Sequence, residues 1–221
     1  MSAILFGSIS TVADTSELQR QAFTQAFEIH GLDWTWDRDE YRAMLSTSGG
    51  ELRISEYARA MGKTVDADAI HATKSEIFRD LMASAELLPR AGVVDTIKQA
   101  KDREWKVGLV TTTSGDNVLA LLAALSPAVQ LLDFDVIVNS SSVERPKPDK
   151  AAYSFALKNM HEEPADCIAI EDNVEGVQAA VAAGLACVAF PNENTAADDF
   201  AAAVGLVDRL DARELQQFAG R

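Results

Sequence analysis

The second half of the chain alternates short apolar runs with helical patterns, and this alternation limits the possible folds more than any other feature. Apolar runs lie at 106–110, 134–138, 167–170 and 186–190. Buried strands that alternate with helices predict a parallel sheet with right-handed crossovers. We therefore expect an α/β fold whose ligands bind at the carboxyl ends of the strands. The helices that we expect around these strands cover 92–103, 116–125, 149–159, 174–183 and about 196–203.

A further apolar run at residues 4–6 opens the chain and leads into a loop that we expect at the same edge of the sheet. Residues 16–86, in contrast, show helical patterns and none of the alternation that is typical of strands. We therefore expect a core domain formed by 1–15 and 87–221, with 16–86 inserted as a cap domain of four or five helices.

Composition and charge exclude several classes of function. The 221 residues include 34 acidic and 20 basic ones, which gives a formal net charge of −14. A negative field of this size repels nucleic acid and anionic lipid, so we expect neither as a partner. No apolar run approaches the roughly 20 residues that span a bilayer, and the start MSAILFGS lacks a clear cleavage signal. Cys167 and Cys187 lie in separate predicted strands and are interpreted as buried thiols, which fits a cytoplasmic protein.

Three loops that follow predicted strands carry residues suited to phosphate chemistry. Thr111 and Thr112 precede a predicted helix, where hydroxyls either bind an anion or cap the helix. Lys147 lies between two prolines, which stiffen its loop, although a single lysine is most often a solvated surface residue. Glu171 and Asp172 end a buried strand and could bind Mg²⁺, or could simply favour the start of the next helix.

The order and spacing of these loops resemble the haloacid dehalogenase superfamily, and the resemblance covers essentially the whole chain. The cap segment, with its Trp34-Thr-Trp36 and Gly49-Gly50 pairs, is similar to the xylulose-1,5-bisphosphate phosphatase and β-phosphoglucomutase-like branch. This resemblance implies a haloacid dehalogenase-like, Rossmann-like core with a helical cap, and a hydrolase that acts on sugar phosphates with Mg²⁺. The ligand that it implies is a phosphorylated small molecule; the sequence contains no signal that fixes an oligomeric state.

The resemblance also implies roles for individual residues. Those that would bind phosphate are Thr111, Thr112 and Lys147, and Asp172 would ligate the metal with Glu171 in support. On the substrate and cap side, the corresponding residues are Asp14, Tyr41 and Arg53.

The first loop departs from the family pattern at the two catalytic positions. In the family one aspartate attacks phosphorus and a second transfers protons, but here these positions hold Gly7 and Ile9. Neither side chain can be a nucleophile or carry a proton, and loss of a nucleophile alone typically costs on the order of 10⁴-fold in rate. We therefore expect a catalytically impaired pseudoenzyme with weakened Mg²⁺ binding, at most a binder of phosphometabolites.

The cap segment departs from the branch as well. Ser16 and Gln19 stand where the branch tends to have Glu and His, and Glu51 replaces a lysine. Because Glu51 replaces a cation, we expect a second phosphate to be held less well.

Two other functions fit the same residues. One is an active phosphatase in which a metal-activated water attacks directly, and loss of turnover on Asp172→Ala would support it. The other is a non-catalytic interaction protein, which would show neither turnover nor phosphate binding but would retain a protein partner.

Overall fold

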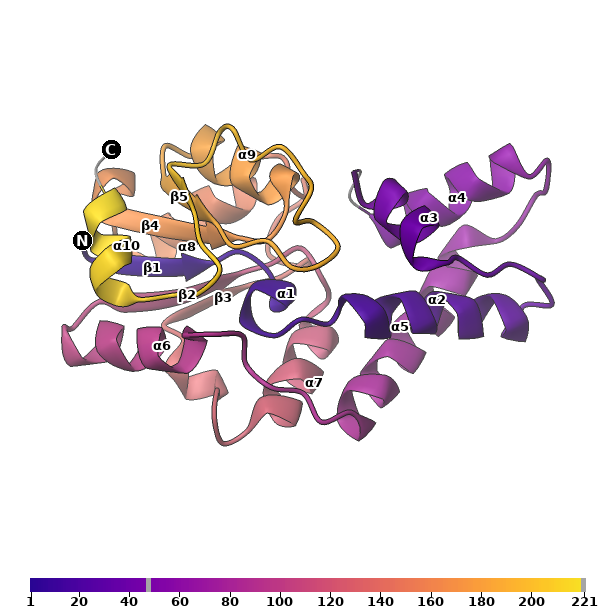
Figure 1. The fold of residues 1–221 in the computed structure, drawn as a ribbon, viewed down its shortest axis with the longest axis horizontal. Helices are drawn as coiled ribbons and strands as arrows, with labels where there is room; N and C mark the ends of the chain where they lie inside the picture. Colours follow the sequence, from indigo (N-terminus) through magenta and orange to yellow (C-terminus); the bar gives the residue numbers. More distant parts are fainter. Residues whose placement is uncertain (47–48, 220–221) are drawn as a thin grey trace. The chain divides into compact units, whose positions relative to one another are not determined.

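The computed structural model describes residues 1–46 and 49–219. Their strands form one six-stranded parallel sheet in the order β3-β2-β1-β4-β5-β6 (Figure 1). This sheet confirms the predicted α/β class, and β1 lies at its centre between β2 and β4. The strands are β1 (Ala3–Phe6), β2 (Lys106–Val110), β3 (Val136–Val138), β4 (Cys167–Glu171), β5 (Ala186–Ala189) and β6 (Gly205–Leu206).

The chain divides into two compact units. One contains Met1–Asp14 and Leu87–Arg221 and holds the sheet; the other is the all-helical segment Thr15–Glu86. Short helix α1 (Ile9–Val12) follows β1 in the first unit. The other helices of that unit are α6 (Val93–Asp102), α7 (Gly115–Leu125), α8 (Ala151–Met160), α9 (Val174–Ala182) and α10 (Ala212–Phe218).

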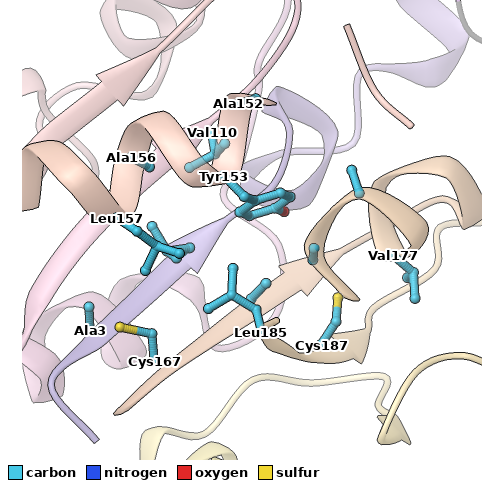
Figure 2. Close-up of a cluster of buried hydrophobic side chains, with 14 of the residues drawn as sticks. Ala3, Val110, Ala152, Tyr153, Ala156, Leu157, Cys167, Val177, Leu185 and Cys187 are labelled. Carbon is cyan, nitrogen blue, oxygen red and sulfur yellow. The ribbon is translucent and has the colours of Figure 1, made fainter. Parts of the chain in front are cut away.

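Helices α8 and α9 pack against one face of the sheet, over a cluster of buried side chains (Figure 2). Ala3 and Leu5 belong to this cluster, whereas Ile4 and Phe6 are buried outside it, as the two-residue period of a strand requires. Ala152 and Ala156 line the face of α8 and let the helix approach the sheet. This close packing brings the side chain of Tyr153, on the same face, to the ends of the strands.

The helical unit is built around aromatic side chains. Its helices are α2 (Ser16–Ile29), α3 (Arg38–Ala43), α4 (Gly50–Ala60) and α5 (Ala67–Ser84). Helices α2 and α5 pack along each other, and rings from α2 contact Trp34 and Trp36 of the following loop at centroid distances of 4.7–5.3 Å. Asp37 and Glu40 form a reciprocal capping box, which stabilises the start of α3.

One predicted element is absent. The helix expected at 196–203 is a series of turns, in which the Asp199 carboxylate accepts the Ala201 N–H at 3.0 Å. Such local side-chain to backbone bonds compete with helix formation, and the helix predicted here was wrong. The short strand β6 and helix α10, which follow, were not predicted. Among the helices of the described residues, none combines the length and apolar character needed to span a bilayer.

Candidate functional site

The loops singled out by the sequence meet at the carboxyl ends of the central strands. In the parallel register Phe6 lies opposite Leu109 of β2 and Ile170 of β4, and the Gly7 N–H donates to the Ile170 carbonyl at 2.8 Å. Gly7 and Glu171 are therefore neighbours across adjacent strands.

Lys147 reaches this edge and is almost fully buried, with 6% of its side chain exposed. Its ammonium group donates to the carbonyl of Gly7, to the carbonyl of Val110 at 2.6 Å and to Oε1 of Glu171 at 2.6 Å. The ring of Tyr153 lies 4.8 Å from the ammonium nitrogen. Because an ammonium group has three protons, these three acceptors use all of them.

The carboxyl group of Glu171 fills the space beside Gly7. A Cβ atom built on Gly7 or on Gly176 would overlap this carboxyl group. Oε1 also accepts a hydrogen bond from the Tyr153 hydroxyl at 2.7 Å, whereas buried Oε2 has no partner among the described residues. Burial raises the pKa of Glu171 above its ordinary value, opposed by the charge of Lys147. The pKa of Tyr153 is raised well above its ordinary value, first by burial and then by the Glu171 charge.

Asp172 is held by a second set of hydrogen bonds. Its Oδ1 accepts from the Ser8 hydroxyl at 2.7 Å and from the Thr11 hydroxyl at 3.4 Å. The Asn173 amide also donates to Oδ1 at 3.2 Å, and the Asn192 amide donates to Oδ2 at 3.2 Å. Side-chain donors thus reach both oxygens of this carboxylate, which is only 4% exposed.

Hydrogen bonds within the protein already use much of the acceptor capacity of these two carboxylates. Mg²⁺ requires near-octahedral oxygen ligands and is usually bound by one or two carboxylates together with waters and substrate phosphates. Protein donors already reach both oxygens of Asp172 and Oε1 of Glu171. Among the described residues, no three His, Cys, Asp or Glu side chains are grouped so as to form a metal site by themselves. The metal-binding roles expected for Asp172 and Glu171 stay predictions.

The hydroxyl groups of Thr111 and Ser114, in the loop after β2, accept hydrogen bonds from the backbone. The Thr111 hydroxyl, 3% exposed, accepts the Thr113 N–H at 3.2 Å. The Ser114 hydroxyl accepts the Asn117 N–H at 3.3 Å and caps α7, while Thr112 is partly exposed. Helix capping, one of the two interpretations of this loop, is therefore present.

Ile9 and Asp14 follow Gly7 in the first segment of the core unit. Ile9 is buried in α1, and its carbonyl accepts the Ala13 N–H at 3.0 Å. Asp14 is exposed at the end of the first segment of the core unit. The Ile9 side chain has no polar atom, so it contributes only apolar surface to this part of the core unit.

The same loop is fixed by Arg90, which the sequence did not single out. Its guanidinium donates to the carbonyls of Ser10 at 3.2 Å, Phe190 at 2.8 Å and Pro191 at 2.6 Å. It also lies 3.5 Å from the centroid of the Phe190 ring. Arg90 thereby ties the loop after β1 to the loop after β5.

In the helical unit, Tyr41 and Arg53 are both buried. The Arg53 Nε donates to the Met44 carbonyl at 3.0 Å, and its guanidinium carbon lies 5.6 Å from the Tyr41 ring centroid and 5.9 Å from that of Phe23. Burial raises the pKa of Tyr41 above its usual value. The structure thus brings these two sequence-predicted residues together around Phe23.

A second cation, Lys74, joins Arg53 at this place. Its side chain is 5% exposed, and its ammonium lies 4.8 Å from the Phe23 centroid and 4.7 Å from that of Phe78. It donates to the Gln19 amide oxygen at 3.2 Å, and no described carboxylate pairs with it. Burial, with a smaller contribution from Arg53, lowers the pKa of Lys74 to about 7.

His71 precedes Lys74 by one turn on α5. Its ring lies so close to Gly50 that a Cβ atom on that glycine would meet it at 2.7 Å. Burial and the charge of Lys74 lower the pKa of His71. The sequence reasoning missed Lys74, although a lysine in the apolar stripe Ile70, Phe78 and Met82 of α5 was a usable signal.

Comparison with known proteins identifies the family. The model of the haloacid dehalogenase-like hydrolases matches residues 1–184. Protein CbbY of Cereibacter sphaeroides is 39% identical over 99% of this chain and 95% of its own length. A crystal structure of CbbY from Rhodobacter sphaeroides in complex with phosphate has a TM-score of 0.87 and 38% identity, covering 95% of this chain and 94% of that one. A variant of that protein, with the same coverage, identity and TM-score, was crystallised with xylulose-1,5-bisphosphate.

These matches confirm the family and the fold that the sequence resemblance implied. The chain belongs to the haloacid dehalogenase-like hydrolases and is related to CbbY.

Proposed function

We propose that this protein binds a phosphorylated small molecule without hydrolysing it through an aspartyl phosphate. The observation that carries this proposal is the buried pair of cations Arg53 and Lys74, in which no described carboxylate pairs with Lys74. A buried amine without a counter-ion is unfavourable, so an anionic ligand would stabilise it. This pair of cations lies in a chain of net charge −14, where it is an exception to the prevailing sign.

The absence of hydrolysis rests on the first loop. Gly7 and Ile9 offer neither a nucleophile nor a proton carrier. The carboxylate nearest to Gly7 is that of Glu171, which is fully buried and already accepts from Lys147 and Tyr153. Because the Glu171 carboxylate already accepts these hydrogen bonds, we expect Mg²⁺ to bind weakly, although relatives in this family generally use that ion.

The ligand class is supported by the relatives. A protein 38% identical to this chain binds phosphate, and its variant binds a pentulose bisphosphate. The two cations of the pair are suited to one phosphoryl group, whereas Glu51 replaces the lysine expected for that branch. We therefore expect a sugar monophosphate to bind about as well as a bisphosphate.

The test is a calorimetric titration of the wild-type protein with sugar phosphates and with the same sugars lacking phosphate. Arg53→Gln and Lys74→Met are expected to weaken binding by roughly tenfold or more each, since each loses a charge-assisted hydrogen bond of at least about 1.4 kcal/mol. The matched control is Arg59→Gln, because Arg59 is on the same helix, α4, but its side chain is 82% exposed.

Equal affinity for phosphorylated and unphosphorylated sugars would contradict the proposal. So would an Arg59→Gln variant that weakens binding as much as Arg53→Gln does. A loss of binding restricted to Arg53→Gln and Lys74→Met would support this pair of cations as the ligand site.

A further inference from the structure

The carboxyl group of Glu171 occupies a space that a side chain at residue 7 would otherwise enter. It lies between Gly7 and Gly176, and a Cβ atom at either position would overlap it. One glycine from the loop after β1 and one from helix α9 thus form a cradle for one carboxylate. This cradle places the carboxylate within 2.6 Å of the Lys147 ammonium.

We propose that the Glu171 carboxylate is an internal anion that occupies the cradle of Gly7 and Gly176 and keeps Lys147 from binding phosphate or other oxyanions. In this arrangement the core unit supplies its own ligand. The inference concerns the core unit alone and goes beyond the proposed function, because binding at the pair of cations Arg53 and Lys74 neither requires it nor follows from it.

Three features of Glu171 support a blocking role over a catalytic one. The side chain is 0% exposed, so a substrate cannot reach it without displacing it. Its Oε1 accepts two hydrogen bonds, from Lys147 and Tyr153. The whole carboxyl group lies between the two glycines, and its Oε2 has no hydrogen-bond partner among the described residues. A carboxylate held in this way neutralises Lys147 but presents no oxygen to solvent.

The position of the Glu171 carboxyl group explains why residue 7 is a glycine. An alanine at position 7 would require the Glu171 carboxyl group to leave the cradle, and Lys147 would then lose its counter-ion. A buried cation without a partner is strongly unfavourable. Glycine at position 7 and the inward conformation of Glu171 are therefore coupled.

The experiment removes the internal anion and supplies an external one. The melting temperature of Glu171→Ala is measured against formate and inorganic phosphate, with sodium chloride at matched ionic strength. At formate concentrations above the dissociation constant, each tenfold increase in formate is expected to raise the melting temperature of Glu171→Ala by about 3–5 °C. The wild type should show no such rise, and Glu171→Ala combined with Lys147→Met should lose it.

Three results would overturn the inference. They are an equal response of Glu171→Ala to formate and to chloride, a response of the wild type as large as that of the variant, and a response that persists without Lys147. Phosphate that stabilises Glu171→Ala would extend the site to larger oxyanions, whereas a response to formate alone would contradict the phosphate part of the proposal.

Should Glu171→Ala not fold, its refolding yield in formate and in chloride replaces the melting temperature, with a gain in formate expected. The second variant is Gly7→Ala, which should lower the melting temperature by about 5 °C or more. Its control is Gly115→Ala, whose methyl group would contact only the Asn139 side chain, at 3.2 Å. An unchanged melting temperature for Gly7→Ala would overturn the inference that Gly7 makes room for the Glu171 carboxyl group.

Discussion

Two lysines, one in each unit of the chain, are buried to the same degree but have opposite surroundings. Lys147 is 6% exposed and donates to a carboxylate and two carbonyls. Lys74 is 5% exposed and has one amide oxygen and two aromatic rings around it. The core thus pairs its cation with a carboxylate, whereas among the described residues of the helical unit no carboxylate pairs with Lys74. The proposed function follows from this difference, since it places the anion site in the helical unit.

The comparison also separates stability from function. A satisfied buried ion pair contributes to folding only as long as both partners are present. A buried lysine without a counter-ion costs folding free energy, and such costs are typical of binding sites. We therefore expect substitutions at the two lysines to differ in sign as well as in size.

The largest effect is expected for Lys147→Met. It leaves the fully buried Glu171 carboxylate without its cation, and breaking such a pair costs about 3–5 kcal/mol. Urea denaturation gives the free energy of unfolding. The double variant with Glu171→Gln should recover part of the loss, and a cost below about 1 kcal/mol for Lys147→Met alone would remove the contrast between the units.

The second effect is a pH dependence that comes from Lys74. Its pKa of about 7 in the folded protein lies below the value of about 10.4 for an unfolded lysine. Between these values the unfolded chain binds the extra proton, so the contribution of Lys74 to stability rises with pH from about 7 to 10, by up to about 1.4 kcal/mol per pH unit.

This dependence is measured as the difference in unfolding free energy between wild type and Lys74→Met at pH 7–9.5. The subtraction cancels the other titrating groups. Lys63→Met is the control, because Lys63 pairs with Asp33 at the surface of the same unit. A flat difference across this range would show that Lys74 keeps its charge on folding.

A smaller effect is expected for Tyr153→Phe. The change removes one hydrogen bond to Glu171 while Lys147 continues to donate to the same oxygen, so we expect a loss of about 1–2 kcal/mol. Tyr57→Phe in the helical unit should stay within about 0.5 kcal/mol. Equal losses for the two tyrosine variants would mean that the Tyr153 hydroxyl adds nothing to the ion pair.

The smallest effect is expected from magnesium. Protein donors reach both Asp172 oxygens. We therefore expect Mg²⁺ at about 10 mM to change the melting temperature by no more than about 1 °C, relative to sodium chloride of equal ionic strength. Differential scanning fluorimetry measures this shift. A saturable rise that disappears in Asp172→Asn would instead identify a working metal site.

The sequence predicted the α/β sheet and its family because strand and helix periods are local properties. It also placed Lys147 and Glu171 at one edge of the sheet, since parallel strands bring their carboxyl ends together. It did not predict the inward conformation of Glu171, which depends on the missing side chain of Gly7, just after the neighbouring strand β1. Nor did it predict the burial of Lys74, which depends on the packing of α2 against α5.

The most direct test of the account is phosphate release from a panel of sugar phosphates with Mg²⁺, alongside calorimetric binding of the same compounds. Lys147→Met and Asp172→Ala, purified identically, reveal any contaminating phosphatase. We predict that at least one sugar phosphate binds and that no phosphate is released above the level of these controls. Release by the wild type that disappears in both variants would contradict the account and would show that the core still performs hydrolysis.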